Sequence, residues 1–136
     1  RWRGFPDLIA EAESLGASFG LAERLGTVAA ELSHGELRQL EVCLALALKP
    51  QVLLLDEPAA GLSPAERVTI LQLLHALPEE LTLVMIEHDM SVLREVVDWM
   101  AVLHFGELVV QGTVPEVQQN EMVRELYLGK KRETHK

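Results

Sequence analysis

The sequence predicts an α/β layer structure with a mainly parallel sheet and flanking helices. From Leu32 onward, helical patterns alternate with short apolar strands, as is typical of that class. One of these strands, at residues 52–55, is a continuous apolar run, which indicates a strand covered on both faces, and the strand at 81–86, rich in Leu, Val and Ile, is also expected to be buried. Hydrophobic residues make up 49% of the 136 residues, so a packed core is expected rather than general disorder.

Residues 1–31 are predicted to form short helices separated by turns. They are rich in Ala, Glu and Leu, and Gly16, Gly20 and Gly26 interrupt them. Pro6 is expected at the start of the first helix, because proline is tolerated at the first helical position.

Two longer helices are predicted from the residues at their ends. Ser33 begins the first, which ends near Lys49-Pro50 because proline cannot continue a helix. Ser63-Pro64-Ala65-Glu66 has the pattern of a capping box with proline at the first helical position, and Pro78 ends that second helix. The residues expected on its apolar side are Val68, Ile70, Leu71, Leu74 and Leu77.

The rest of the chain continues the alternation of helices and strands. A strand at Leu81–Ile86 precedes a helix around Met90–Val97, and a strand around Met100–Phe105 precedes a hairpin turn at Gly106-Glu107. The remaining predicted elements are a strand at Leu108–Gln111 and short helices at Pro115–Gln119 and Glu121–Leu126.

The charge balance argues against nucleic acid as a partner. Lys and Arg number 12 against 21 Asp and Glu, which gives a formal net charge of −9. An acidic chain repels a phosphate backbone. The basic cluster of Lys130, Lys131, Arg132 and Lys136 is expected to be a solvated tail.

Cysteine and hydropathy patterns fit a domain without disulfides or membrane spans. The single cysteine, Cys43, lies in an apolar helical run and is expected to be buried. No apolar stretch approaches the ~20 residues that span a bilayer. Because the chain opens on Arg1, without an initiator Met, we expect it to be an excerpt of a longer protein.

Two adjacent carboxylates follow the first apolar strand. Asp56 and Glu57 come directly after Val52–Leu55, at the strand end where open α/β sheets bind ligands. Phosphoryl transfer needs one acid to hold Mg²⁺ and another to orient the attacking water. The alternative interpretation is a solvated Asp-Glu pair in a turn.

A helix start at Ser33 provides a second candidate site. Backbone N–H groups at a helix N-terminus bind phosphate, Gly35 allows close approach, and the Ser33 hydroxyl can donate a hydrogen bond. The alternative is that Ser33 and Glu36 form only a capping box. Because its carboxylate would repel phosphate, Glu36 fits the first interpretation only if it points back to the cap.

A histidine after the second strand provides the third candidate. His88 follows Ile86-Glu87, and imidazole can donate a hydrogen bond to phosphate while remaining neutral. A purely structural histidine is one alternative. Zinc binding by His88 with Glu87 or Asp89 is another, weakened because no second histidine falls at helical spacing.

In their order and spacing, these motifs resemble those of ATP-binding-cassette (ABC) ATPases. Residues 52–58 resemble the Walker B element. Leu32–Glu36 resembles the signature Leu-Ser-Gly-Gly-Gln, with His34 and Glu36 in place of the first glycine and the glutamine. His88 matches the family's histidine after the next strand.

The resemblance implies a role for each of these residues. Asp56 would bind Mg²⁺, Glu57 would polarise the attacking water, and His88 would contact the γ-phosphate. The nucleotide-binding residues at the signature would be Ser33, His34, Gly35 and Glu36. Residues 60–63 take the place of the family's D-loop, so the dimer contacts would be Gly61, Leu62 and Ser63, although Ser63 stands where the family usually has Asp.

The resemblance also implies a partial fold. The chain would hold part of a P-loop NTPase (RecA-like) core, with residues 1–31 as a remnant of the helical subdomain and 32–136 as the C-terminal half of the nucleotide-binding core. No Gly-x-x-x-x-Gly-Lys-Ser/Thr loop occurs in it. Because the strand leading to that loop should lie between the strands at 81–86 and 100–105, we expect a gap in the sheet and marginal stability for this stretch alone.

The implied function is ATP hydrolysis that drives an importer. Segments such as 56–62, 86–90 and 127–129 look most like ATPase subunits of branched-chain amino acid importers, and urea-type importers, which are close relatives, remain an alternative. The implied cofactors are ATP and Mg²⁺, and the implied partners are a second ATPase subunit, arranged head to tail, and transmembrane permease subunits. The location would be peripheral, at the cytoplasmic face of the inner membrane. Two alternatives remain: a non-catalytic dimerisation fragment and a soluble ABC ATPase outside transport.

Overall fold

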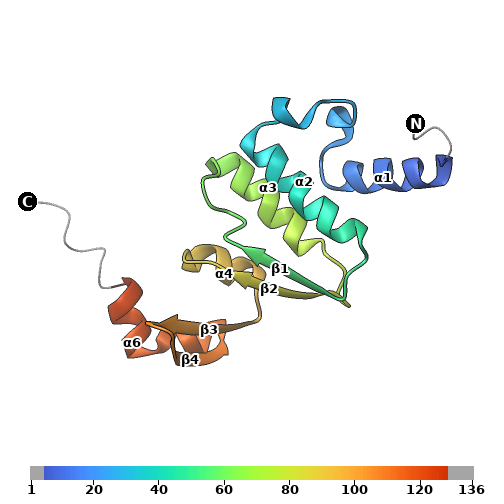
Figure 1. The fold of residues 1–136 in the computed structure, drawn as a ribbon. Coiled ribbons are helices and arrows are strands. Elements are labelled where there is room, and N and C mark those ends of the chain that lie inside the picture. The colour runs from blue at the N-terminus through green and yellow to red at the C-terminus, as the bar shows by residue number, and fades with distance from the viewer. Residues whose placement is uncertain (1–4, 129–136) are drawn as a thin grey trace, which may run out of the picture. The chain divides into compact units, whose positions relative to one another are not determined.

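The computed structural model describes residues 5–128, which form a mixed α/β structure (Figure 1). The α-helices are α1 (Pro6–Ser18), α2 (His34–Ala47), α3 (Pro64–His75), α4 (Met90–Val96), α5 (Val114–Gln119) and α6 (Glu121–Val123). The strands are β1 (Val52–Asp56), β2 (Thr82–Ile86), β3 (Trp99–His104) and β4 (Glu107–Thr113). Short 3-10 turns cover Ala22–Arg24 and Ala29–Glu31, and a π-helical turn covers Arg124–Leu128.

Of the described residues, 5–88 form one compact unit and 89–128 form another. In the first unit, α1 starts with Pro6 at its first position, as predicted. The expectation that Gly16 interrupts the helix is wrong, because Gly16 lies inside α1 and is buried. A Cβ there would lie 2.7 Å from Cδ2 of Leu25, so this glycine allows Leu25 to pack against the helix.

Helix α2 has well-defined ends. Ser33 is its N-cap, with the reciprocal bonds of a capping box to Glu36. After Ala47 the chain reverses through Lys49, whose φ of 51° is the left-handed conformation that commonly closes a helix. The Lys49 ammonium pairs with Glu11 of α1 at 2.6 Å.

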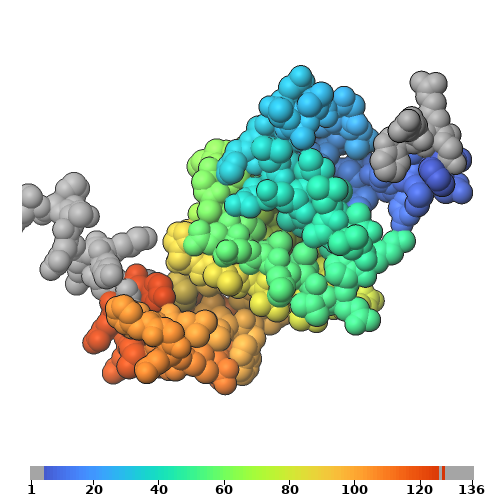
Figure 2. All heavy atoms as spheres, viewed as in Figure 1, coloured from blue at the N-terminus to red at the C-terminus, as the bar shows by residue number. Residues whose placement is uncertain are grey.

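Strands β1 and β2 pair in parallel, with Leu54 opposite Val84 and Asp56 opposite Ile86. Helices α2 and α3 cover one face of this pair (Figure 1). The buried cluster beneath them contains Phe19, Val42, Cys43 and Leu53, with Leu55, Leu73 and Leu83 packed against it. In the space-filling view, the α2 and β1 segments form one continuous packed surface, cyan to green (Figure 2).

The other face of β1 and β2 is exposed, which corrects the expectations that β1 is covered on both faces and that β2 is buried. Along it lie the exposed apolar side chains of Val52, Leu54, Val84 and Ile86. Within the described residues, this unit supplies helices to one face alone. Val68 was also misplaced: it is 54% exposed, whereas Ile70, Leu71 and Leu74 of the same helix are buried.

The second unit is built on an antiparallel hairpin of β3 and β4. Its turn is at Phe105-Gly106, one residue earlier than predicted, and both residues have positive φ, as the central residues of a type I′ hairpin turn do. The core residues of this unit are Met100, Val102, Val114, Val117 and Val123, with Met90, Leu93 and Val97 packed against them. Since β2 and β3 belong to separate sheets, the predicted interruption of the sheet is confirmed.

Other expectations concern single features. Cys43 is buried, as predicted. Within residues 5–128, no helix is both long and apolar enough to cross a membrane. The basic cluster at residues 130–136, and Gly129 of the 127–129 segment, lie outside the described residues.

Candidate functional site

The candidate acids lie where β1 ends, beside the end of β2. Asp56 is the last residue of β1 and is exposed. The N–H of Glu57 donates to the carbonyl of Ile86 at 2.9 Å, which extends the strand pairing by one step. Because the two strands are parallel, their carboxyl ends lie at one edge and bring the Asp56-Glu57 and His88 segments together.

The side chains of Glu57 and His88 contact each other directly. Nδ1 of His88 lies 3.0 Å from Oε1 of Glu57. A carboxylate only accepts hydrogen bonds, so this geometry assigns the hydrogen to Nδ1. The pair remains open to solvent, with 71% of the His88 side chain and 46% of the Glu57 side chain exposed. A phosphate group could therefore reach both residues.

The backbone of Glu57 is unusual. Its φ of 45° lies in the left-handed region, which is uncommon for a residue other than glycine. Hydrogen bonds on both sides hold it there: its N–H donates to Ile86, and its carbonyl accepts from the N–H of Ala60 at 3.1 Å. Such conformations persist where the surroundings fix them, often at functional positions.

Glu87 holds the loop that follows the two acids. Its Oε1 accepts a hydrogen bond from the N–H of Ala59 at 3.1 Å. The loop after β1 is thereby tied to the end of β2. From the sequence, Glu87 was expected only as a possible zinc ligand, because a bond between residues 28 positions apart leaves no local pattern to reveal it.

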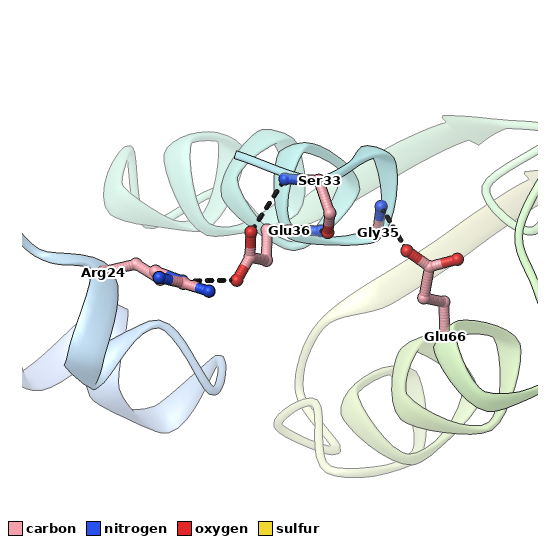
Figure 3. Close-up of polar contacts among 5 residues, drawn as sticks. All are labelled: Arg24, Ser33, Gly35, Glu36 and Glu66. Carbon is pink, nitrogen blue, oxygen red and sulfur yellow. Dashed lines mark hydrogen bonds and ion pairs between the residues drawn. The ribbon is translucent and has the colours of Figure 1, made fainter. Parts of the chain in front are cut away.

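At the start of α2, Glu36 points back to the cap (Figure 3). Its Oε2 accepts from the N–H of Ser33 at 2.8 Å, and its Oε1 pairs with Nε of Arg24 at 2.6 Å. The Ser33 N–H and then Arg24 hold the pKa of Glu36 below its ordinary value of 4.5. This is the orientation that the sequence required if Ser33 and Gly35 were to meet a phosphate. Arg24 was not anticipated as a partner.

Gly35, in the first turn of α2, already has an anionic partner. Its N–H donates to Oε1 of Glu66 at 3.0 Å, a contact from α3 to α2 (Figure 3). The sequence indicated Glu66 only as the capping residue of its own helix. That expectation is confirmed, because Glu66 and Ser63 form a complete capping box.

The residues predicted to contact a second subunit lie between β1 and α3. Gly61 has a φ of 72°, a conformation that glycine adopts without strain. A Cβ at Gly61 would lie 3.4 Å from Nε2 of His34, so the loop passes close to the start of α2. Leu62 is half-buried, and Ser63 is exposed as the N-cap of α3.

The structure thus forms two clusters of the predicted residues. One unites the β1 and β2 ends through Glu57 and His88. The other unites the start of α2 with Arg24, Glu66 and the loop at Gly61. Within residues 5–128 there is no group of three or more His, Cys, Asp or Glu residues arranged to hold a metal ion. The exposed carboxylate of Asp56 does have the donor chemistry that Mg²⁺ takes from proteins, one or two carboxylates beside substrate phosphates.

A large apolar cavity in the first unit does not coincide with either cluster. Its volume is about 730 Å³, and Gln51, just before β1, and Leu81, just before β2, help to line it. The candidate acids are at the opposite ends of the same strands. Both clusters of predicted site residues therefore lie outside this cavity, on open surface.

Comparison with known proteins identifies the class to which this arrangement belongs. The family model described as "ABC transporter" matches residues 7–60, which include the start of α2 and the end of β1. Among solved structures, the ATP-binding cassette MJ1267 in its ADP conformation superposes with a TM-score of 0.79 at 25% identity, covering 90% of this chain and 50% of that one. The protein cbiO1 from Clostridium perfringens gives a TM-score of 0.75 at 26% identity, covering 92% of this chain and 52% of that one. The fold is that of a mixed α/β P-loop NTPase.

Curated relatives point to the same family. The methionine import ATP-binding protein MetN of Xanthomonas euvesicatoria is 41% identical over 113 residues, 82% of this chain and 34% of that protein. The branched-chain amino acid transport ATP-binding protein LivG of Salmonella typhimurium is 36% identical over 112 residues, 81% of this chain and 44% of that protein. The chain belongs to the ABC transporter family and spans less than half the length of these two relatives.

Proposed function

We propose that this chain is part of an ATP-binding subunit that hydrolyses ATP to drive amino acid import. The observation that carries the proposal is the contact between Glu57 and His88 across the ends of two parallel strands. A carboxylate paired with an imidazole at an open edge suits the orientation of a water molecule against a terminal phosphate. Relatives named for methionine import and branched-chain amino acid transport support the transport role.

In this proposal Glu57 is the residue that polarises the attacking water. Its carboxylate accepts the hydrogen on Nδ1 of His88, which fixes both side chains at the strand edge. His88 would then present its other nitrogen, Nε2, toward the γ-phosphate. With the hydrogen on Nδ1, a neutral ring can only accept a hydrogen bond at Nε2, so donation to phosphate requires the doubly protonated ring, unlike the neutral donor expected from the sequence. Asp56 would hold Mg²⁺, which neutralises phosphate charge when bound.

The second cluster would serve a nucleotide held by another subunit. Ser33, His34, Gly35 and Glu36 form the signature in this proposal, and Gly61, Leu62 and Ser63 form the subunit contact. The proximity of Gly61 to His34 supports placing both groups at one interface. Two subunits would pair head to tail, so that each completes the other's site.

The proposed setting is a transporter complex at the cytoplasmic face of the inner membrane. Transmembrane permease subunits would be the membrane partners. The transported solute is proposed to be an amino acid, of the branched-chain type if the resemblance of the segments at 56–62 and 86–90 extends to specificity. Residues 1–31 would be the end of a helical subdomain, and 32–136 the second half of the nucleotide-binding core.

The test is a Glu57→Gln substitution in the full-length protein. Glutamine keeps the shape of the side chain but cannot act as a base, so ATP turnover should fall by at least about 100-fold. ATP binding should persist, and ATP-bound dimers should accumulate on size-exclusion chromatography. The measurements are steady-state phosphate release and dimer content with Mg-ATP.

Glu79→Gln is the matched control. Glu79 is an exposed glutamate in the turn before β2, away from the strand ends that carry Asp56 and Glu57. This variant should retain wild-type turnover. Turnover that is unchanged by Glu57→Gln would remove Glu57 from the catalytic role.

A further inference from the structure

The first turn of α2 is occupied by a carboxylate from elsewhere in the chain. The first N–H groups of a helix have no partner within the helix, which is why they bind anions. In this structure the N–H of Gly35 donates to Oε1 of Glu66, a residue 31 positions later on α3 (Figure 3). An internal anion therefore lies where the signature would receive a phosphate oxygen.

The Glu66 carboxylate is held firmly in this position. Its Oε2 accepts from the N–H of Ser63 at 2.9 Å and from the Ser63 hydroxyl at 2.6 Å, which leaves Oε1 directed at Gly35. These bonds from Ser63, followed by that from Gly35, hold the pKa of Glu66 below its ordinary value of 4.5. Glu66 is consequently an anion at neutral pH, at the positive end of the α2 dipole.

The Glu66 side chain also fills the space next to Gly35. Gly35 is buried, and a Cβ at this position would lie 2.6 Å from both Cγ and Oε1 of Glu66. The Glu66 side chain thus fills the volume directly over Gly35. A phosphate oxygen cannot approach this N–H while Glu66 remains there.

We propose that Glu66 is a built-in occupant of the Gly35 N–H, which a phosphate group must displace before it can bind the start of α2. This inference rests on the proposed function for the identity of the phosphate, an ATP held by the second subunit. In the absence of nucleotide, the Glu66 carboxylate accepts the hydrogen bond of the Gly35 N–H and covers the N-terminus of α2. Glu66 would thereby raise the ATP concentration that subunit pairing requires.

The direct test is the response of the Gly35 amide to inorganic pyrophosphate. The full-length protein is labelled with ¹⁵N-glycine, and the Gly35 signal is followed during a pyrophosphate titration of wild type and Glu66→Ala. A hydrogen bond to a charged acceptor must be broken in the wild type alone, so half-saturation should require about tenfold less pyrophosphate in the variant. An equal response in both proteins would overturn the proposal.

Glu116→Ala is the matched control for the loss of a helix cap. Glu116 forms the same type of capping box with Thr113, at the start of α5, and its pKa is lowered by the Thr113 side chain and backbone in the same way. In Glu116→Ala, the Gly35 amide should reach half-saturation at the same pyrophosphate concentration as in wild type. A decrease in that concentration like the one expected for Glu66→Ala would overturn the proposal. If Glu66→Ala does not fold, Glu66→Gln keeps the side-chain shape without the charge and should show the same direction of change.

A second measurement separates this inference from the proposed function. ATP-dependent dimer formation is measured in wild type, Glu66→Ala and Glu116→Ala. If wild type dimerises, Glu66→Ala should need severalfold less ATP, in the direction of the pyrophosphate shift, and an unchanged requirement would overturn the inference. If wild type shows no ATP response, the proposed function fails, and the pyrophosphate titration alone decides the role of Glu66.

Discussion

Three glutamates, Glu36, Glu66 and Glu116, accept hydrogen bonds from the backbone N–H three positions before them. In each case hydrogen bonds to the charged form hold the pKa below the ordinary 4.5. The largest contribution comes from the Ser33 N–H for Glu36, and from the hydroxyl of Ser63 or Thr113, followed by its N–H, for Glu66 and Glu116. Glu36 is further supported by Arg24, and Glu66 by Gly35. The capping of the N-termini of α2, α3 and α5 therefore depends on pH.

The free energy of unfolding should therefore decrease at acidic pH, because these glutamates become protonated and lose their stabilising contribution. A group with a depressed folded pKa contributes stability above its unfolded pKa, near 4.5, and loses it as the pH drops through the folded value. The double variant Glu36→Gln, Glu66→Gln should be less stable than wild type at pH 7, and the difference should shrink to nothing as the pH falls below the lowered pKa values of the two glutamates. Urea unfolding followed by circular dichroism at several pH values measures the difference. Parallel stability curves would contradict the prediction.

The caps illustrate which residues can be predicted from sequence. Ser33 with Glu36, and Ser63 with Glu66, are separated by three positions, so a local pattern reveals them. The bonds from Arg24 to Glu36 and from Gly35 to Glu66 cross 12 and 31 positions. These distant partners depend on how helices pack, and nothing in the neighbouring residues indicates them.

Strand β1 has two faces with different surroundings. Leu53 is 4% exposed, within the core under α2 and α3, whereas the adjacent Leu54 is 72% exposed. The sequence predicted the strand itself and its ending in Asp56 correctly. It could not distinguish the faces, because Val52–Leu55 is apolar throughout, and such a run is typical of strands buried on both sides.

Alanine substitutions at these two neighbours should differ sharply. Leu53→Ala removes packed atoms from the core and should lower the free energy of unfolding by about 2–5 kcal/mol. Leu54→Ala removes atoms already in water and should change it by no more than about 0.5 kcal/mol. Both variants are compared by urea unfolding of this 136-residue chain at a protein concentration low enough for the chain to be monomeric, because association through the exposed face would cover Leu54. Equal losses would mean that the Leu54 face is covered in solution.

The alternation of helices and strands was predictable along nearly the whole chain. Pro6, Pro50, Pro64 and Pro78 mark element boundaries through their fixed backbone geometry and missing N–H. The patterns along the chain did not indicate that the strands divide into two separate two-stranded sheets, within residues 5–128. Strand pairing depends on which segments meet in space, and the family resemblance alone indicated an interruption.

The isolated chain should be weakly stable and prone to self-association. Two-stranded sheets are only marginally stable by themselves. Unpaired backbone N–H and C=O groups at their edges, and an exposed apolar face, favour association with another chain. The side chains concerned are Val52, Leu54, Val84 and Ile86. Sedimentation velocity at several concentrations should show concentration-dependent association, accompanied by a low, broad thermal transition. A monomer with a sharp transition at high temperature would contradict this expectation.

The left-handed backbone at Glu57 limits what can replace this residue. Valine or isoleucine at a φ of 45° would distort the chain reversal as well as delete the carboxylate, so an inactive variant of that kind would have two causes. Glycine would relax the backbone but leave no acid at the strand end. Chain geometry alone favours glycine here, and the proposed chemistry requires an acid. A substitution of Glu57 therefore loses either the backbone conformation or the carboxylate.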